Sequence, residues 1–521
     1  MNDSPYNFSF NRTDYEFKIR LFNGENSIYL KPEGFDDLYI EEDIFDWKMK
    51  GSIVINSPYD SLERESTQAL ELGDKKNLVY KFRGDGRDTI FISIMPKKGG
   101  PLADMIKEDF EEELWRIELE AVIHDVADND HQNIGSKSKT LYFVEKTYQL
   151  MSEKNTEFTT SNVGANKDKK DAYRLNNEER SLKTGEALGE LLATDTDFQK
   201  HAEHYIGGDK DDWDVGSDKN KIFYTSSTNN NFLDDMDYIM SNHTANDSDD
   251  NQPCLLKLER GIAAGEPKQF SLKSLKSYFK EAGKSTAGKY QIEQLFLENY
   301  SENEKNNVPI IKSPLSKDAS LNLNVSAEDF STVSTYSVLD FSGQDYASNL
   351  HNRFITSHNS KKGQFNIEIK EHKTEKYQEF FEKSIVPNIL TTQTKDRLPL
   401  TKYIKNGYNS QYYYSEAYSA ENRLADGRNK LISYYLFLNI GISFSLRGLT
   451  RRQAGRFFGL NRNTLNDKDF DHLIEGQYFV TNVIHHFSTK TRSYNTHTTA
   501  IKCHKYKDDN PLKSEDDADI K

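Results

Sequence analysis

The chain has 521 residues, which at roughly 150 residues per domain predicts three or four domains. Its 68 Lys and Arg residues against 83 Asp and Glu give a net charge of −15, which disfavours a general nucleic-acid binder, because phosphate binding needs a basic surface. Only 35% of the residues are hydrophobic, but 12% are aromatic, with 30 Phe and 29 Tyr. Such a chain can bury several modest cores, so disorder throughout is excluded.

Two cysteines, Cys254 and Cys503, are too few for a disulfide framework or a Cys-rich zinc module. The first ten residues have neither the basic start nor the apolar centre of a secretory signal. The longest apolar stretch, Leu431–Leu446, is interrupted by polar residues and falls short of the ~20 apolar residues that span a bilayer. We therefore expect a soluble protein made in a reducing compartment, with no stable membrane association.

The first 165 residues are dominated by alternation of apolar and polar side chains, which is typical of half-buried strands. In Tyr15–Leu21, for example, Tyr, Phe, Ile and Leu alternate with charged residues. Further strands are expected at 51–56, 78–82, 89–95, 115–123 and 140–150. Many short strands separated by turns predict an antiparallel β-barrel or sandwich.

Beyond a polar, lysine-rich stretch at Ser161–Arg180, the apolar spacing becomes helical. Three helices are predicted, at about 197–208, at 232–240 and from a cap at Ser271 to about 279. A short strand is expected at Cys254–Leu258. This part of the chain predicts a small mixed α/β domain.

Strand alternation returns at Phe365–Ile369 and again at Ile442–Leu446. Between them, the tyrosines from Tyr408 to Tyr418 show no strand or heptad period, and predict a long ordered loop or a subunit interface. The segments Gln477–Phe487 and Ser493–Lys505 are expected to pair as two strands. An acidic tail is expected after them.

A search for catalytic and metal-binding patterns assigns no residue. The segment 282–286 resembles the end of a phosphate-binding loop, but the glycine needed five residues before Gly283 is Tyr278. The acidic run Asp209, Asp211, Asp212, Asp214 and Asp218 is interrupted by large side chains and has no closing Glu, so a solvated loop is favoured over a calcium site. No nucleophile elbow or Cys–His arrangement stands out, and the chain is not expected to be an enzyme.

Histidines suggest metal ligands at two places. His485 and His497 would lie close together if their strands pair, but His485 and His486 would face opposite sides of the sheet. His201 and His204 are spaced for one helix face, but no third ligand is evident. Ordinary strand histidines are therefore expected, with no catalytic, cofactor-binding or metal residue.

The stretch from Arg428 to Arg462 reverses the sign of the charge, since it contains seven basic residues and no acid. Two interpretations remain open. The first is a scattered solvated surface, and the second is a basic patch that docks an acidic protein surface or nucleic acid.

Several stretches resemble one known family. Ile40–Phe45 followed by Gly51, Ile53 and Ile55 is similar to its "I-x-E-D/S-I" phrase and "G-x-I-x-I" strand. Further matches lie along the chain in the family's order: Leu72-Gly73-Asp74, Leu78–Phe82, Phe223-Tyr224-Thr225, Gly448, Arg452, Gly455, Phe458, Gly476–Val480 with His486, and Tyr494-Asn495-Thr496. The last strands are similar to its "G-x-Y-x-V-x-x-V-x-H" ending. The family is the baseplate central hub proteins of contractile-tailed bacteriophages.

This resemblance implies a mainly β protein of the α+β kind, with two antiparallel β-barrel domains flanking a smaller mixed α/β domain. The implied boundaries are 1–165 for the first barrel, 166–330 for the mixed domain, 331–507 for the second barrel and 508–521 for the flexible acidic tail. Insertions are expected at about 166–220 and 371–430. With no β-helix pattern after Lys507, the spike is expected to be a separate polypeptide.

The resemblance also implies a function. Family members form a homotrimeric ring that adapts the sixfold tail tube to the threefold central spike and leaves a channel through which DNA passes transiently. The expected partners are the tail tube protein, the spike protein and the baseplate wedge proteins, in a virion assembled in the host cytoplasm. A related contractile injection machine, a tail-associated peptidoglycan-degrading enzyme and a glycan-binding adhesin remain as alternatives.

Overall fold

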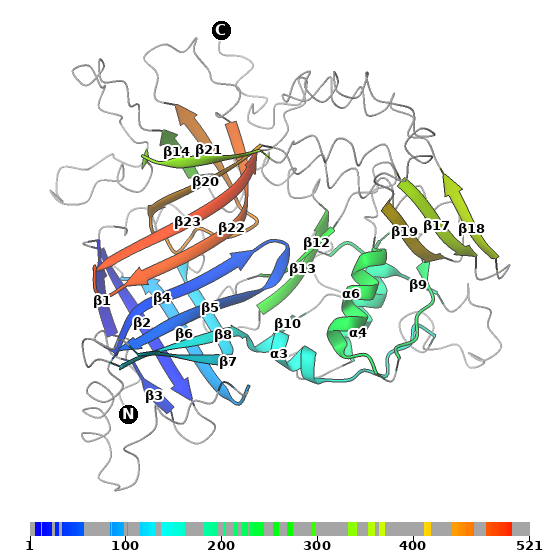
Figure 1. Ribbon diagram of the computed structural model, residues 1–521, viewed down its shortest axis with the longest axis horizontal. Coiled ribbons are helices and arrows are strands. Elements are labelled where there is room, and N and C mark those ends of the chain that lie inside the picture. Colours follow the sequence, from blue (N-terminus) through cyan, green and yellow to red (C-terminus); the bar gives the residue numbers. More distant parts are fainter. Residues whose placement is uncertain are drawn as a thin grey trace, which may run out of the picture.

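In the computed structural model, most of the described backbone is β strand, and only a few short helices are described (Figure 1). No described helix is long and apolar enough to cross a membrane. The structure describes residues 6–11, 13–22, 27–30, 34–56, 84, 86–97, 102, 115–130, 137–161, 181–194, 202–203, 213–216, 221–227, 229–243, 254–259, 268–274, 293–297, 332–340, 353–359, 364–369, 411–417, 440–462 and 476–502.

A single branched sheet of 15 strands unites the two ends of the chain. Its main path runs β1-β2-β6-β7-β8-β5-β4-β22-β21-β14-β15, while β3 pairs with β2, and β23 links β22 to β20 and β16. The strands are β1 (Tyr6–Phe10), β2 (Thr13–Phe22), β3 (Ser27–Tyr29), β4 (Phe35–Asp43), β5 (Asp46–Asn56), β6 (Asp88–Pro96), β7 (Ile117–Asp130), β8 (Lys137–Glu145), β14 (Glu293–Leu297), β15 (Thr332–Val333), β16 (Tyr336–Asp340), β20 (Ile440–Arg447), β21 (Phe457–Arg462), β22 (Gly476–Ser488) and β23 (Ser493–Lys502).

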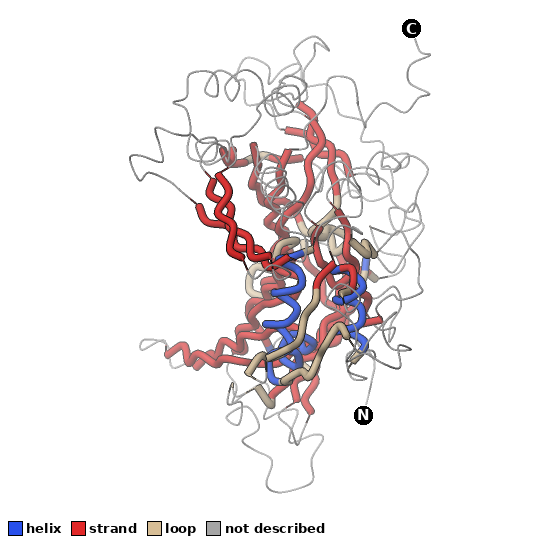
Figure 2. Tube along the Cα trace, turned by 90° about the vertical axis from the view of Figure 1, so that its right-hand side faces the viewer, coloured by secondary structure: helices blue, strands red, loops and turns tan. Residues whose placement is uncertain are grey.

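Three small sheets and three helices make up the rest of the described elements. Figure 1 places α3, α4 and α6 together on one side of the large sheet, and Figure 2 shows them grouped among the strands. The elements are β9 (Leu182–Lys183) with β11 (Lys221–Ile222); β10 (Ala202–Glu203), β13 (Lys268–Ser274) and β12 (Cys254–Glu259); β17 (Arg353–Asn359), β18 (Gln364–Ile369) and β19 (Gln411–Ala417); and α3 (Lys146–Glu153), α4 (Thr184–Ala193) and α6 (Phe232–Asn242).

The fold is thus mainly β with largely antiparallel sheets, as the alternation predicts. In β2 the apolar residues Tyr15, Phe17, Ile19 and Leu21 are all buried and the charged residues between them are not. The strands predicted at 51–56, 89–95, 254–258 and 365–369 are confirmed. Among the described residues, no ladder of strand pairs closes into a barrel.

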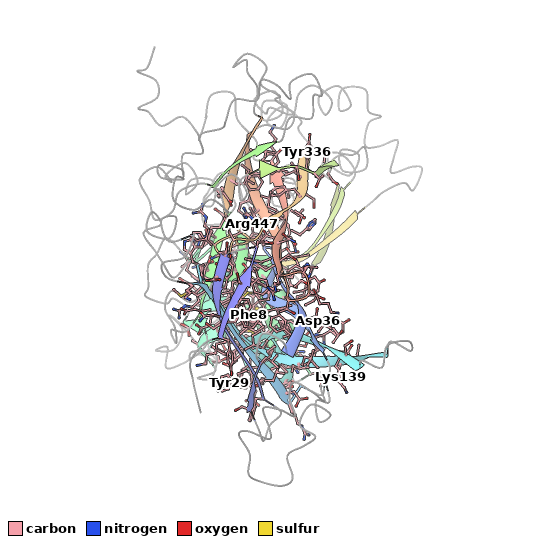
Figure 3. All side chains as sticks on the ribbon, turned by 90° about the vertical axis from the view of Figure 1, so that its left-hand side faces the viewer. Phe8, Tyr29, Asp36, Lys139, Tyr336 and Arg447 are labelled. Carbon is pink, nitrogen blue, oxygen red and sulfur yellow. The ribbon has the colours of Figure 1, made fainter. Side chains whose placement is uncertain are left out.

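The first hydrophobic core includes side chains from the C-terminal hairpin β22–β23. Phe487 and Tyr494 stack with ring centroids 3.9 Å apart, and Phe487 meets the ring of Phe10 at 5.6 Å. At the turns, the backbone N–H of Asn11 donates to the carbonyl of Arg492 at 2.8 Å. The N-terminal strands therefore share their core with residues from the other end of the chain, and Figure 3 shows Phe8 within this dense part.

A second core lies under the helices, and a third lies between the later strands. Helix α6 is confirmed where predicted, and Asn231 caps it by accepting from the N–H of Asp234, whose carboxylate accepts from the N–H of Asn231. The third core gathers apolar side chains from β14, β15 and β20–β23. It contains Phe444 and Phe458, whose rings meet edge-on at 5.4 Å.

Three local predictions are wrong. The segment from Ser271 is strand β13, because it pairs with β12, placing Leu256 opposite Leu272. Ala202–Glu203 is also strand, paired in parallel with β13, instead of part of a helix. The strand expected to reach residue 150 ends at Glu145, where α3 begins.

The tyrosine-rich segment also departs from the prediction, because 411–417 is strand β19, paired in parallel with β17. Tyr408 and Tyr418 lie outside the described residues, as do the strand expected at 78–82 and the acidic tail.

Candidate functional site: the seam between the two ends of the chain

Strands β4 and β22 carry the two most distinctive sequence motifs and pair directly with each other. They run antiparallel, with Ile40 opposite His485 and Glu41 opposite Ile484. The amide of Asn482 donates to the carboxylate of Glu41 at 3.0 Å. The "I-x-E-D" phrase and the "V-x-x-V-x-H" strand are therefore two halves of one structural unit, which we call the seam.

A buried polar group lies on the inner face of the seam. His485 is fully buried, and its Nδ1 shares a 2.8 Å hydrogen bond with the hydroxyl of Tyr494. Its Nε2 lies 3.7 Å from a carboxylate oxygen of Glu42, which is also buried. Because buried polar groups are costly unless partnered, this arrangement favours one register of β4 against the C-terminal hairpin.

Charged residues link the mixed α/β region to the segment before β21. Lys257 of β12 lies 3.1 Å from a carboxylate oxygen of Glu259, and the positive charge of Arg456 acts on both. Burial alone would raise the pKa of the Glu259 carboxyl, but Lys257 and Arg456 outweigh it and hold that pKa at about 2. Glu259 therefore stays ionised, and its charge attracts Arg456 of the segment that leads into β21.

The outer face of the seam presents a row of side chains that crosses four strands. Register pairs align His486, Tyr39, Ser52 and Tyr142 on β22, β4, β5 and β8. Tyr39 and Tyr142 are 37% and 40% exposed, so this face of the sheet presents two tyrosine rings to solvent. We call these four residues the outer row.

Local contacts hold the outer row in place. The His486 ring stacks on that of Tyr39, with centroids 4.2 Å apart and planes 9° from parallel. The His486 Nε2 also lies 3.0 Å from the carboxylate of Asp37. Burial raises the pKa of the Tyr39 hydroxyl, as does the negative charge of Asp37.

The turn between β4 and β5 extends this surface. Phe45 lies at its tip and is 43% exposed. Beside it, Lys48 forms a 2.7 Å ion pair with Asp46, and the Lys48 ammonium lies 4.1 Å from the centroid of the Tyr148 ring. The combination of exposed aromatic rings with a rim of paired charges is typical of a protein–protein contact.

Within the basic stretch, Arg452 makes an internal connection. Arg452 is buried and forms a 2.7 Å ion pair with Glu293 of β14, while its second terminal nitrogen donates to the carbonyl of Arg447 and to Thr496. Arg451 lies over the ring of Trp115 at 5.6 Å. Figure 3 places Arg447 where the lower and upper strands meet. For Arg452, neither interpretation from the sequence, solvated surface or docking patch, is correct.

The histidine predictions can be tested in part. The hairpin β22–β23 forms as predicted, with Ile484 opposite His497, but His485 is buried and His497 exposed, so the two cannot share a metal ion. His485 and His486 face opposite sides, as predicted. His201, His204, Cys503 and His504 have no described side chains, and the segment 282–286 lies outside the described residues.

Within the acidic run, only Asp214 is described, and it lies beside two residues that the sequence patterns did not connect to it. Asp214, His243 and Cys254 each offer a ligand atom, and these atoms all lie within 4.8 Å of one another. No spacing motif could have found the group, because its members come from three separate segments.

Neither a family model nor a curated protein matches the chain. Solved structures do resemble it. A tail protein from Neisseria meningitidis is 8% identical, covers 94% of this chain and 96% of its own, and gives a TM-score of 0.45. The solved structures that resemble this chain include tail and baseplate proteins.

Two further solved structures resemble the chain at similarly low sequence identity. The 43 kDa tail protein of prophage MuSo2 from Shewanella oneidensis is 6% identical, with 93% of this chain and 98% of its own covered at a TM-score of 0.41. The half-lidded Francisella PdpA–VgrG complex is 10% identical at a TM-score of 0.44. The match covers 96% of this chain but 59% of the Francisella chain, so this chain spans about three fifths of that protein.

Proposed function

We propose that this chain is a structural hub subunit of a contractile tail baseplate, without enzymatic activity. The observation that carries the proposal is the seam. The two hub-like motifs stand at opposite ends of the sequence, yet β4 and β22 pair residue by residue. The pairing of both motifs in adjacent strands of one sheet supports their being parts of one hub-like unit.

The finer proposal follows the hub architecture. Two barrel-like β domains, at 1–165 and 331–507, flank a mixed domain at 166–330, with an insertion at about 371–430 and a flexible tail at 508–521. The first barrel would be completed by the C-terminal hairpin, as the shared core of Phe10, Phe487 and Tyr494 supports. Two related barrels in each of three chains would convert threefold symmetry to sixfold symmetry.

In this proposal the homotrimeric ring seats the tail tube on one face and the central spike on the other, and contacts the surrounding wedge proteins. DNA would pass only transiently along the axis during genome ejection, and the acidic composition would limit its adhesion to the channel wall. The subunit would belong to the virion and would assemble in the host cytoplasm.

We assign the outer row to the contact with a neighbouring subunit. Tyrosine is enriched at the centre of such contacts because it buries a large area at a small cost in conformational entropy. The stacked His486–Tyr39 pair and Tyr142 supply that area on a rigid sheet.

Mass photometry of the purified chain tests the ring. Three copies of the 60.2 kDa chain, about 181 kDa together, are expected. The variant Tyr39→Glu with Tyr142→Glu should shift the population to monomers, because two desolvated charges would be buried in the contact. The control Val338→Glu, at a side chain that is 51% exposed in β16, should remain trimeric.

Cryo-EM of the ring then locates the contact. If the ring forms without the outer row in it, the assignment of that surface is wrong while the hub proposal stands. If the protein remains monomeric at every concentration and with its tube and spike partners present, the hub proposal itself fails.

A further inference from the structure

The mixed α/β region holds three metal-ligating side chains of different chemistry in one buried corner. Asp214 follows Trp213, which bridges in parallel to Leu272 of β13. His243 is the C-cap residue of α6, and Cys254 is the first residue of β12. Their carboxylate, imidazole and thiol atoms all lie within 4.8 Å of one another. The corner therefore joins a loop, a helix end and a strand start.

Burial distinguishes this group from the exposed acidic clusters of the surface. His243 is 1% exposed and Cys254 8%, and the side chain of Asp214 is 17% exposed. Three groups that can carry charge are rarely brought together inside a protein unless something compensates them. A divalent cation would compensate a carboxylate and a thiolate at once.

The imidazole is already turned in the direction that a metal requires. Its Nδ1 shares a 2.7 Å hydrogen bond with the hydroxyl of Thr184, the first residue of α4. Its Nε2 lies 3.8 Å from an oxygen of Asp214. Metal-ligating histidines almost always use their second ring nitrogen for such a bond to oxygen, which fixes the orientation of the ring.

The loop that carries Asp214 is held just as firmly. The backbone N–H of Asp214 donates to the carbonyl of Leu272 at 2.8 Å. The N–H of Gly216 donates to the carboxylate of Asp214, also at 2.8 Å. Gly216 has a φ of +86°, and a Cβ there would lie 2.8 Å from the Thr184 hydroxyl. Only glycine lets the loop pass so close to the pair Thr184–His243, so the ligands and their support form one built unit.

We propose that Asp214, His243 and Cys254 bind one zinc ion, with a fourth position left for water. One sulfur, one nitrogen and one oxygen ligand suit zinc, whereas calcium and magnesium prefer oxygen alone. Tetrahedral zinc with bonds of about 2.0–2.3 Å keeps ligand atoms about 3.3–3.7 Å apart. The Asp214–His243 separation of 3.8 Å is already close to this range, and the other separations, all within 4.8 Å, would contract by at most about 1.5 Å on binding. On binding, the Cys254 thiol releases its proton to solvent.

The proposed ion would tie together three segments of the mixed region. Because it would bind the folded arrangement and not the unfolded chain, it would raise the stability of this region. This inference is independent of the proposed function, since a zinc clamp would serve a hub subunit or any other protein with this fold.

The test uses the full-length protein, stripped with a chelator, reloaded with zinc alone and freed of excess metal. Elemental analysis should find about one zinc per chain. Cys254→Ser and His243→Gln should each lower that content at least fivefold. Cys503→Ser is the matched control, because it removes the other cysteine, and it should retain the wild-type content.

Cobalt reports the geometry without any variant. Cobalt-loaded wild-type protein should show the intense visible bands of a tetrahedral ion and a thiolate-to-cobalt charge-transfer band, which Cys254→Ser should lose and Cys503→Ser should keep. Zinc should also raise the Tm of the wild type by a few degrees. Substoichiometric zinc, an octahedral cobalt spectrum without charge transfer, or equal binding by Cys254→Ser would each overturn the proposal.

Discussion

The two β regions of the chain are held together by different means. The first core is almost entirely apolar and aromatic, and depends on Phe487 and Tyr494 from the C-terminal hairpin. The third core gathers fewer described side chains, and the largely buried ion pair Arg452–Glu293 joins β14 to the segment before β21. The first region is therefore built mainly on apolar burial, whereas the second adds a directional polar contact at Arg452.

Removing the shared aromatic ring should have the largest effect. Phe487→Ala would leave a cavity among Phe10, Phe17 and Tyr494, and should lower the free energy of unfolding by about 4 kcal/mol. Urea unfolding followed by tryptophan fluorescence measures it, since Trp115 lies in the same core. The control Val338→Ala, at an exposed site, should change it by less than about 0.5 kcal/mol. A loss below about 1 kcal/mol would refute the shared core.

Breaking the ion pair should come next. Arg452→Met would leave Glu293 buried without its partner, and should cost about 3 kcal/mol. The double variant Arg452→Met with Glu293→Met should recover much of that loss, because neither charge then remains buried. Denaturant unfolding of all four members of the cycle gives the coupling. A loss in the double variant equal to the sum of the losses in the two single variants would mean that the pair does not act as a unit.

Lowering the pH should reduce the free energy of unfolding through the Arg452–Glu293 pair, by a smaller amount than the substitutions above. Burial alone would raise the pKa of the Glu293 carboxyl, but the guanidinium of Arg452 outweighs it and holds that pKa below the unfolded value of about 4.3. The ionised Glu293 therefore stabilises the fold above about pH 4.3, and this contribution is lost as the pH falls through the lower folded-state pKa.

The variant Glu293→Gln tests the assignment. Below about pH 4.3, stability should fall less steeply in the variant than in the wild type, whereas Phe487→Ala should keep the wild-type slope. Unfolding curves at several pH values between about 7 and 3 supply the comparison. Identical slopes for Glu293→Gln and the wild type would remove Glu293 from the explanation.

The smallest effect is expected at the contact between the regions. The hydroxyl of Tyr15 donates to the carbonyl of Gly448 at 3.3 Å. Tyr15→Phe should therefore cost about 1 kcal/mol, because the ring remains while the hydrogen bond is lost. Thermal unfolding of Tyr15→Phe beside the wild type measures this change. A stabilised Tyr15→Phe would show that this hydrogen bond contributes nothing.

Much of the fold was predictable because alternation is a local signal. Residues such as Phe17 and Ile19 show their burial in their spacing, and helix α6 shows itself in the apolar spacing of 232–240. The segment from Ser271 was predicted as a helix because Leu272 and Leu275 fit one helix face. It is a strand because it pairs with β12. Pairing between distant segments overrode local periodicity.

Neither the seam nor the group Asp214, His243 and Cys254 could be predicted from local sequence patterns, for the same physical reason. Nothing around His485 indicates that Glu42 and Tyr494 will surround it, because one of these lies at the far end of the chain. The interior position of Arg452 was equally hidden, since a run of basic residues has the same composition whether it faces water or Glu293.

The shared sheet also has a consequence for how the protein is made. Glu41 and Asn482 lie 441 residues apart, so at about 5–20 residues per second a ribosome needs on the order of 20–90 s to deliver β22 after β4. During that interval β4 presents an unpaired edge, and the aromatic side chains beneath it lack their cover. Nascent chains are therefore expected to need chaperones until the C-terminal hairpin arrives.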